Sequence, residues 1–196
     1  MFDLEKQKEH FKKHIASFKD YGNIKILDFK NPESVNYRIR FLFEEDYCRL
    51  HISGDLGELI ACNFNNMTYE GFADFVNNTG YFQGKICCNN RPIYYYDYDK
   101  AKADLEKKLD IDLFENHIDV QIGISTPEEC KEEFIEDVLS YLCDDTGIDA
   151  RGYDKLCELD PDCFEWMEYI GREESGILEL YMLAFKLAQE QLEGKG

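Results

Sequence analysis

The chain has 196 residues and a mass of 23.1 kDa, a size at which about 70% of the unfolded chain's surface can be buried. Hydrophobic residues make up 44% and aromatic residues 14%, which excludes a disordered chain. The formal net charge is −19, from 22 Lys and Arg against 41 Asp and Glu. This charge argues against direct binding to nucleic acids and to anionic membranes, because both require clustered Lys and Arg.

The N-terminal part predicts a helix followed by an antiparallel sheet. Residues 3–20 carry apolar side chains near a period of 3.6, with Asp3 as N-cap and Gly22 just beyond the helix end. Three or four strands follow, at residues 24–27, 35–43, 47–53 and 58–64. Apolar and polar side chains alternate from Val35 to Phe43, as is typical of a half-buried strand, and Gly54 and Gly57 predict a tight hairpin.

After Phe64 the pattern is mainly helical. Helices are expected near residues 68–76, 99–109, 126–143, 160–170 and 175–192. The strongest start signal is Thr126-Pro127-Glu128-Glu129, with a Thr cap, Pro at the first helical position and Glu at the third. Residues 80–98 are rich in aromatic side chains and predict neither a helix nor a strand clearly; an edge strand at Tyr94-Tyr95-Tyr96 is one interpretation.

These elements predict the fold class α+β. We expect an N-terminal helix, a three- to four-stranded antiparallel sheet and an acidic helical C-terminal half. Residues 1–98 would form the helix and sheet region and residues 99–196 the acidic helical region, packed together as one domain.

A charged N-terminus indicates a cytosolic protein, and this bears on the eight cysteines of the chain. The first ten residues contain no apolar run that could act as a signal peptide, and no stretch is long enough to span a membrane. The cysteines are therefore expected as thiols. Their closest pairs are the adjacent Cys87 and Cys88 and the separated Cys157 and Cys163, a spacing that does not fit a structural zinc site.

The excess negative charge lies in the C-terminal half. Residues 1–98 carry 12 Lys and Arg and 14 Asp and Glu, whereas residues 99–196 carry 10 and 27. Like charges four residues apart destabilise a helix, and the predicted helix after Thr126 contains four such acidic pairs. The candidate partner-binding residues are Glu128, Glu129, Glu132, Glu133, Glu136, Asp137, Asp144, Asp145 and Asp149.

A rigid acidic helix can imitate a phosphate backbone. Side chains three or four residues apart on a helix are about 5–6 Å apart at Cβ, close to the spacing of consecutive phosphates on one nucleic-acid strand. The partner expected on this basis is a basic nucleic-acid-binding protein. The alternative is an acidic structural or assembly protein whose charge serves only solubility.

Other candidate sites carry weaker signals, and no catalytic residue, metal ligand or cofactor is assigned. His10 and His14 have the spacing of helical zinc ligands but lack the Glu that follows the first His in such motifs. The run from Asp144 to Asp149 departs from calcium-loop spacing. A small enzyme with a site near the 51–58 hairpin, using His51, Asp55 or Glu58, is kept as an alternative function.

The segments Tyr37–Phe41, His51–Gly57 and Gly80–Phe82 resemble those of small acidic proteins encoded by bacteriophages of Gram-positive hosts. Some proteins of that kind are anti-CRISPR inhibitors, which bind Cas effector nucleases and block their nucleic-acid channels. The resemblance implies a stoichiometric inhibitor in the host bacterial cytosol and carries over no functional residue. The oligomeric state is left open.

Overall fold

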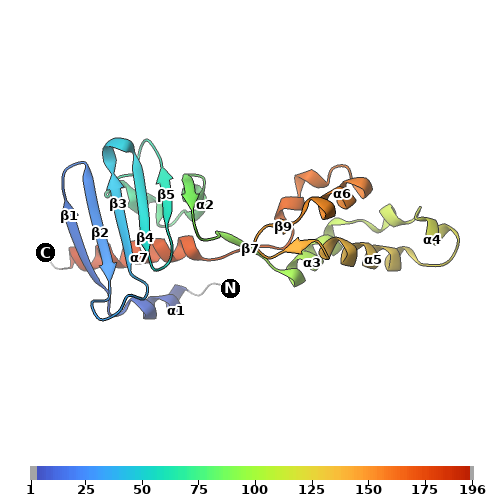
Figure 1. Cartoon of the computed structure of the whole chain (residues 1–196), viewed down its shortest axis with the longest axis horizontal. Coiled ribbons are helices and arrows are strands. Elements are labelled where there is room, and N and C mark those ends of the chain that lie inside the picture. Colours follow the sequence, from blue (N-terminus) through green and yellow to red (C-terminus); the bar gives the residue numbers. More distant parts are fainter. Residues whose placement is uncertain (1–3, 195–196) are drawn as a thin grey trace. The chain divides into compact units, whose positions relative to one another are not determined.

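The computed structural model describes residues 4–194 and confirms the α+β class (Figure 1). The α-helices are α1 (Leu4–Lys8), α2 (Thr79–Gln83), α3 (Tyr98–Lys108), α4 (Ile118–Gln121), α5 (Pro127–Leu139), α6 (Ala150–Leu159) and α7 (Ile177–Glu193). The strands are β1 (Ile15–Asp20), β2 (Ile24–Lys30), β3 (Ile39–Glu44), β4 (Arg49–Gly54), β5 (Leu59–Cys62), β6 (Ile86–Asn89), β7 (Tyr94–Tyr96), β8 (Leu142–Cys143), β9 (Gly147–Ile148) and β10 (Arg172–Glu174).

Short 3-10 helices complete the described chain. They are η1 (Glu9–Phe11), η2 (Glu45–Tyr47), η3 (Gly71–Phe75), η4 (Ile111–Phe114), η5 (Cys163–Glu165) and η6 (Met167–Tyr169). The helix expected at residues 68–76 is realised as η3, and the one at 160–170 as η5 and η6.

The chain divides into two compact units. One, which we call the sheet unit, is formed by the two ends of the chain, up to Ile93 and from Ser175 onward. The other, the insertion, runs from Tyr94 to Glu174. The expected regions 1–98 and 99–196 do not follow this division, because the apolar side chains of α7 pack in the same core as the sheet.

The sheet unit is built on six antiparallel strands in the order β1-β2-β3-β4-β5-β6. The meander was therefore expected correctly, but the number of strands, three to four, was too small. Side chains of paired residues share one face, and Phe41 pairs with Leu27 on one side and with Ile52 on the other. All three side chains are fully buried, so this face of the sheet forms the core.

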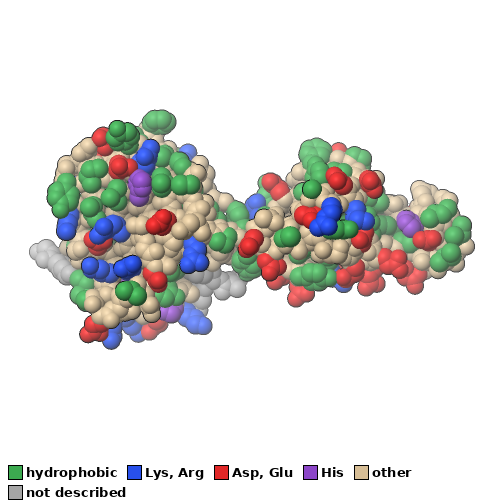
Figure 2. Space-filling model, viewed as in Figure 1, with side chains coloured by type: hydrophobic (Ala, Val, Ile, Leu, Met, Phe, Trp, Pro, Cys, Tyr) green, Lys and Arg blue, Asp and Glu red, His purple; other side chains and the backbone are tan. Residues whose placement is uncertain are grey.

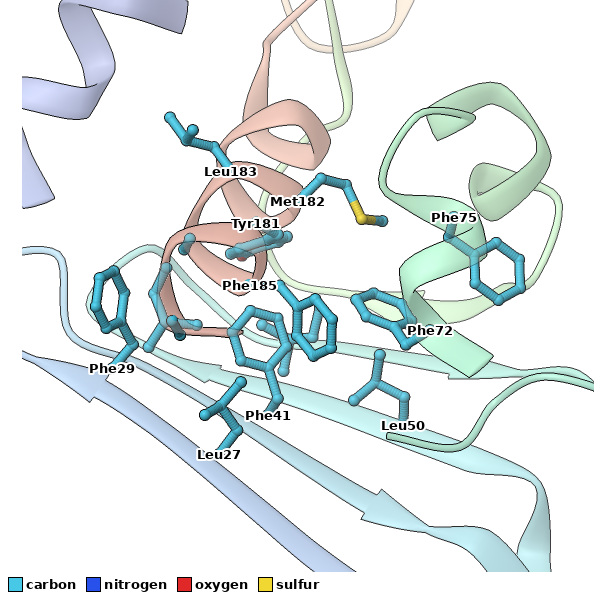
Figure 3. Close-up of a cluster of buried hydrophobic side chains, with 14 of the residues drawn as sticks. Leu27, Phe29, Phe41, Leu50, Phe72, Phe75, Tyr181, Met182, Leu183 and Phe185 are labelled. Carbon is cyan, nitrogen blue, oxygen red and sulfur yellow. The ribbon is translucent and has the colours of Figure 1, made fainter. Parts of the chain in front are cut away.

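Helix α7 covers the buried face of the sheet (Figure 3). Phe185 of α7 lies against Phe41 and Phe72, with ring centroids 5.3 and 4.8 Å apart. Phe72 comes from η3, whose first turn is held by the Thr68 hydroxyl accepting a hydrogen bond from the Gly71 amide. This aromatic cluster joins the last helix to the middle of the sheet and confirms the prediction of a packed helix after Ser175.

The expected helix at residues 3–20 is wrong. Only α1 and η1 are helical, and β1 begins at Ile15. The apolar period of 3.6 was overridden by sheet pairing, because β1 adds a strand to β2 with Ala16 buried and Ile15 half-exposed. The proposed cap, Asp3, lies outside the described residues.

The strand expected from Val35 begins only at Ile39. Tyr37 has a φ of 57°, a left-handed conformation that a strand does not contain. Its amide donates a hydrogen bond to Asp55 Oδ2 and its ring stacks on His10. Residues before Ile39 therefore form a loop held from two sides, and Val35 is exposed.

The insertion has its own hydrophobic core. Its ends are joined by β7 and β10, which pair antiparallel with Tyr94 opposite Glu174. Between them, α3, α5 and α6 bury a separate cluster that includes Leu105, Val138 and Leu156. The N-cap of α3 is Asp97, two residues before the expected Asp99. The helix after Thr126 ends at Leu139, before the expected Cys143, because Leu142 and Cys143 pair with β9.

Candidate functional site

The insertion carries nearly all of the excess charge of the protein. Residues 94–174 contain 8 Lys and Arg against 25 Asp and Glu, a net charge of −17. The rest of the chain contains 14 and 16, a net charge of −2. The sheet unit is therefore nearly neutral, and the question of an acidic site is a question about the insertion.

Helix α5 begins with the capping box that its sequence predicts. The Thr126 hydroxyl accepts a hydrogen bond from the Glu129 amide at 3.2 Å, and Glu129 Oε2 accepts one from the Thr126 amide at 2.8 Å. Pro127 occupies the first helical position, where a missing amide proton costs nothing. These contacts fix the start of α5 and so fix the direction of its side chains.

The two faces of α5 differ completely. One face buries Cys130, Ile135, Val138 and Leu139 in the core of the insertion. The opposite face is exposed and consists of six acidic residues in two columns, each residue one turn from the next. We call these residues the acidic face of α5: Glu128, Glu132 and Glu136 in one column, and Glu129, Glu133 and Asp137 in the other. Figure 2 shows Asp and Glu side chains gathered over this part of the insertion.

Part of the acidic face is neutralised by neighbouring helices. Glu136 accepts hydrogen bonds from Lys102 Nζ and from the Tyr98 hydroxyl, and the Lys102 contact chiefly holds the pKa of Glu136 below its usual range. Asp137 forms an ion pair with Lys155. These contacts lie toward the C-terminal end of α5 and tie it to α3 and α6.

Three carboxylates of this face have no such partner. Glu128, Glu132 and Glu133 take part in no hydrogen bond or ion pair of their side chains within residues 4–194, and all three are exposed. Repulsion between neighbours one turn apart destabilises a helix by a few tenths of a kcal/mol per pair. Glu128 lies in the first turn, where a negative charge favours the helix dipole. The stability of α5 does not account for Glu132 and Glu133, which lie further along the helix.

The remaining three predicted residues divide between two roles. Asp144 and Asp145 are exposed in the turn of the β8–β9 hairpin. Asp149 is the N-cap of α6, where its carboxylate accepts hydrogen bonds from the Arg151 and Gly152 amides. The Arg151 guanidinium bonds the same carboxylate and lowers its pKa. Asp149 is thus a structural residue, which the sequence analysis did not foresee because it missed α6.

An exposed apolar segment precedes α5 and was also missed. Ile118, Ile122 and Ile124 are 61, 59 and 71% exposed. We call them the apolar segment; Figure 2 shows hydrophobic side chains over the α4 end of the insertion. Exposed isoleucines so close together are typical of interaction surfaces. The signal in the sequence was the alternation of the apolar residues Ile118, Val120, Ile122 and Ile124 with Asp119, Gln121 and Gly123, outside every predicted helix and strand.

The side chains of the other candidate sites make contacts within the fold instead of forming a site. His51 Nε2 lies 2.7 Å from Glu44 Oε2, whereas Asp55 accepts the Tyr37 amide, so His51 and Asp55 form no pair within the described residues. His14 is buried and His10 stacks on Tyr37. Across residues 4–194, no three His, Cys, Asp or Glu side chains gather in a way that could hold a metal ion.

No helix between residues 4 and 194 is both long and apolar enough to cross a membrane. Comparison of the chain with protein-family models, with curated proteins and with solved structures finds no match. Any inference about function therefore rests on the geometry and charge of the insertion.

Proposed function

We propose that the insertion binds the basic nucleic-acid channel of a bacterial defence nuclease, as a phage counter-defence protein of the anti-CRISPR, DNA-mimic type acting in the host cytosol. The observation that carries this proposal is the acidic face of α5, where six carboxylates stand in two columns on one rigid helix. Each column repeats about every 6 Å, the rise of four residues, and so matches the spacing of phosphates along a strand.

The charge distribution supports a specific surface. A charge needed only for solubility could be spread over both units, but the sheet unit is nearly neutral. RNA-guided nucleases hold their nucleic acids in a strongly positive channel. A concentrated negative field accelerates association with such a surface and makes the binding dependent on salt.

The apolar segment extends the same interaction surface. It ends at Ile124, two residues before the N-cap of α5, so apolar and acidic contacts are available to one partner. Charged contacts at an interface rim contribute mainly to rate and specificity, whereas buried apolar anchors contribute most of the affinity. The partner therefore has a basic groove with an apolar pocket beside it. Self-association through this segment is opposed by the repulsion between two acidic insertions.

The proposal is tested by cleavage assays with purified RNA-guided nucleases of Gram-positive bacteria. The first variant changes Glu128, Glu132, Glu133, Asp144 and Asp145 to the corresponding amides. The matched control changes five other exposed acidic residues of the insertion: Glu115, Asp154, Glu158, Asp162 and Glu165. Both variants lose the same amount of charge, so they separate the site from the total charge.

We expect inhibition of at least one nuclease at stoichiometric concentration. The first variant should inhibit at least about fivefold less well, because five exposed charge contacts at about 0.2–1 kcal/mol each add up to about 1–5 kcal/mol. The control variant should stay within about threefold of the wild type. Equal losses in the two variants, or no inhibition of any nuclease, would refute the proposal.

A further inference from the structure

Two cysteines of the insertion lie in direct contact. Cys157 Sγ of α6 and Cys163 Sγ of η5 are 3.0 Å apart. The chain reverses between them at Asp160, whose carbonyl accepts the Cys163 amide and whose carboxylate accepts the Asp162 amide. The contact is thus set by a hydrogen-bonded turn and by the packing of Cys163 in the core.

The two thiols differ in accessibility. Cys157 is half-buried, whereas Cys163 is fully buried. Burial, and then the contact with Cys157, raises the pKa of Cys163 to about 12. Because the thiolate is the reactive form of cysteine, Cys157 is the thiol that an external reagent reaches first and Cys163 is the thiol that follows.

The surroundings of the pair are acidic. Asp160 and Asp162 lie near enough to raise the pKa of Cys163 further, and Asp154 and Glu158 flank Cys157 in the sequence. A negative field of this kind repels anionic reagents and attracts cationic ones. The site therefore selects among small disulfides by their charge.

We propose that Cys157 and Cys163 form a reversible redox site, which is closed to a disulfide by a cationic low-molecular-weight disulfide. In the first step Cys157 Sγ bonds to one sulfur of the reagent, the reagent's S–S bond breaks, and one reagent thiol leaves. In the second step Cys163 Sγ bonds to Cys157 Sγ and the second reagent thiol leaves. The two cysteines lose two electrons and two protons, and the reagent is reduced to two thiols.

The site is independent of the proposed partner and has a direct physical consequence. The disulfide would join the last turn of α6 to η5 and constrain the unfolded insertion, which stabilises the folded form. In a reducing cytosol such bonds are transient and serve redox sensing. The insertion would thus be more resistant to unfolding under oxidising conditions.

The test uses the complete chain and peptide mass spectrometry. Residues 156–172 form one tryptic peptide, from the residue after Lys155 to Arg172, and it contains both cysteines. The folded protein is treated with cystamine, a cationic disulfide, or with oxidised glutathione, an anionic one. Free thiols are then alkylated before digestion. Exposed Cys143 reports the general reactivity of thiols in the same sample.

With cystamine, we expect this peptide to lose two hydrogens and to take up no alkyl group. Cys163→Ser should stop at the mixed disulfide on Cys157, and Cys157→Ser should leave Cys163 unreacted. Cystamine should react about tenfold faster than oxidised glutathione at low salt. A peptide that stays doubly alkylated after Cys143 has reacted would overturn the proposal, as would a stable mixed disulfide on wild-type Cys157. Equal rates for the two reagents would overturn the charge selectivity.

Discussion

Replacing Glu132 and Glu133 with Gln should stabilise the insertion. Each of these residues has a like-charged neighbour one turn before it and another one turn after it on α5, so the double variant removes four repulsive pairs. At a few tenths of a kcal/mol per pair, the free energy of unfolding should rise by about 1–2 kcal/mol at low salt. Within residues 4–194, neither side chain takes part in a hydrogen bond or ion pair that this change would remove.

Urea unfolding followed by tryptophan fluorescence measures this effect. The chain has a single Trp, Trp166, which packs against the core of the insertion and so reports on that unit. The gain should be present at about 10 mM salt and largely lost at about 1 M, where the screening length falls to about 3 Å. The control variant Glu115→Gln/Glu165→Gln removes as much charge without removing a pair on α5. An equal gain in the control, or a gain that salt does not reduce, would refute the reasoning.

Three further results follow from the fold. Replacing residues 94–174 with Asn-Gly should leave a sheet unit that unfolds cooperatively by circular dichroism, because the Ser175 amide bonds the Ile93 carbonyl at 2.8 Å and the ends already meet; an unfolded product would contradict the two-unit division. Phe185→Ala should lower the free energy of unfolding of the sheet unit by about 3–5 kcal/mol and leave the Trp166 transition in place, since the ring is fully buried; a loss below about 1 kcal/mol would contradict its place in the core. Burial lowers the pKa of His14, so folding favours the neutral form of its imidazole. The contribution of His14 to stability should be complete above about pH 6.5 and should fall as the pH drops below it. A urea midpoint that does not change with pH, or a pH profile that is the same in His14→Gln, would contradict this.

Local signals predicted those elements whose ends are set by adjacent residues. The Thr126-Pro127 start of α5 needs only contacts within four residues, and the apolar residues of α7 are dense from Leu178 to Ala188. The hairpin after Gly54 is equally local, because Gly54 and Gly57 have φ angles of 148° and 113°, which glycine adopts readily and other residues rarely do. In these cases the sequence alone contains the physical cause of the structure.

Other elements depend on contacts far apart in the chain. Ile15 has the spacing of a helix but pairs opposite Lys30 in a sheet. The N-cap of α6 at Asp149 was read as one acidic residue among many, so its structural role was missed. For the candidate site, charge and spacing placed the acidic residues of α5 on one helix. They could not show which carboxylates have partners, because Lys102 lies 34 residues from Glu136 in the sequence.

The central claim is that the acidic face of α5 occupies the place of nucleic acid in its partner. The most direct measurement takes a nuclease that the protein inhibits and asks whether the labelled protein binds it in the presence of saturating guide and target nucleic acid. The account predicts mutual exclusion, with the apparent affinity falling as nucleic acid is added and as salt is raised. A ternary complex of undiminished affinity, or binding that salt does not weaken, would contradict it.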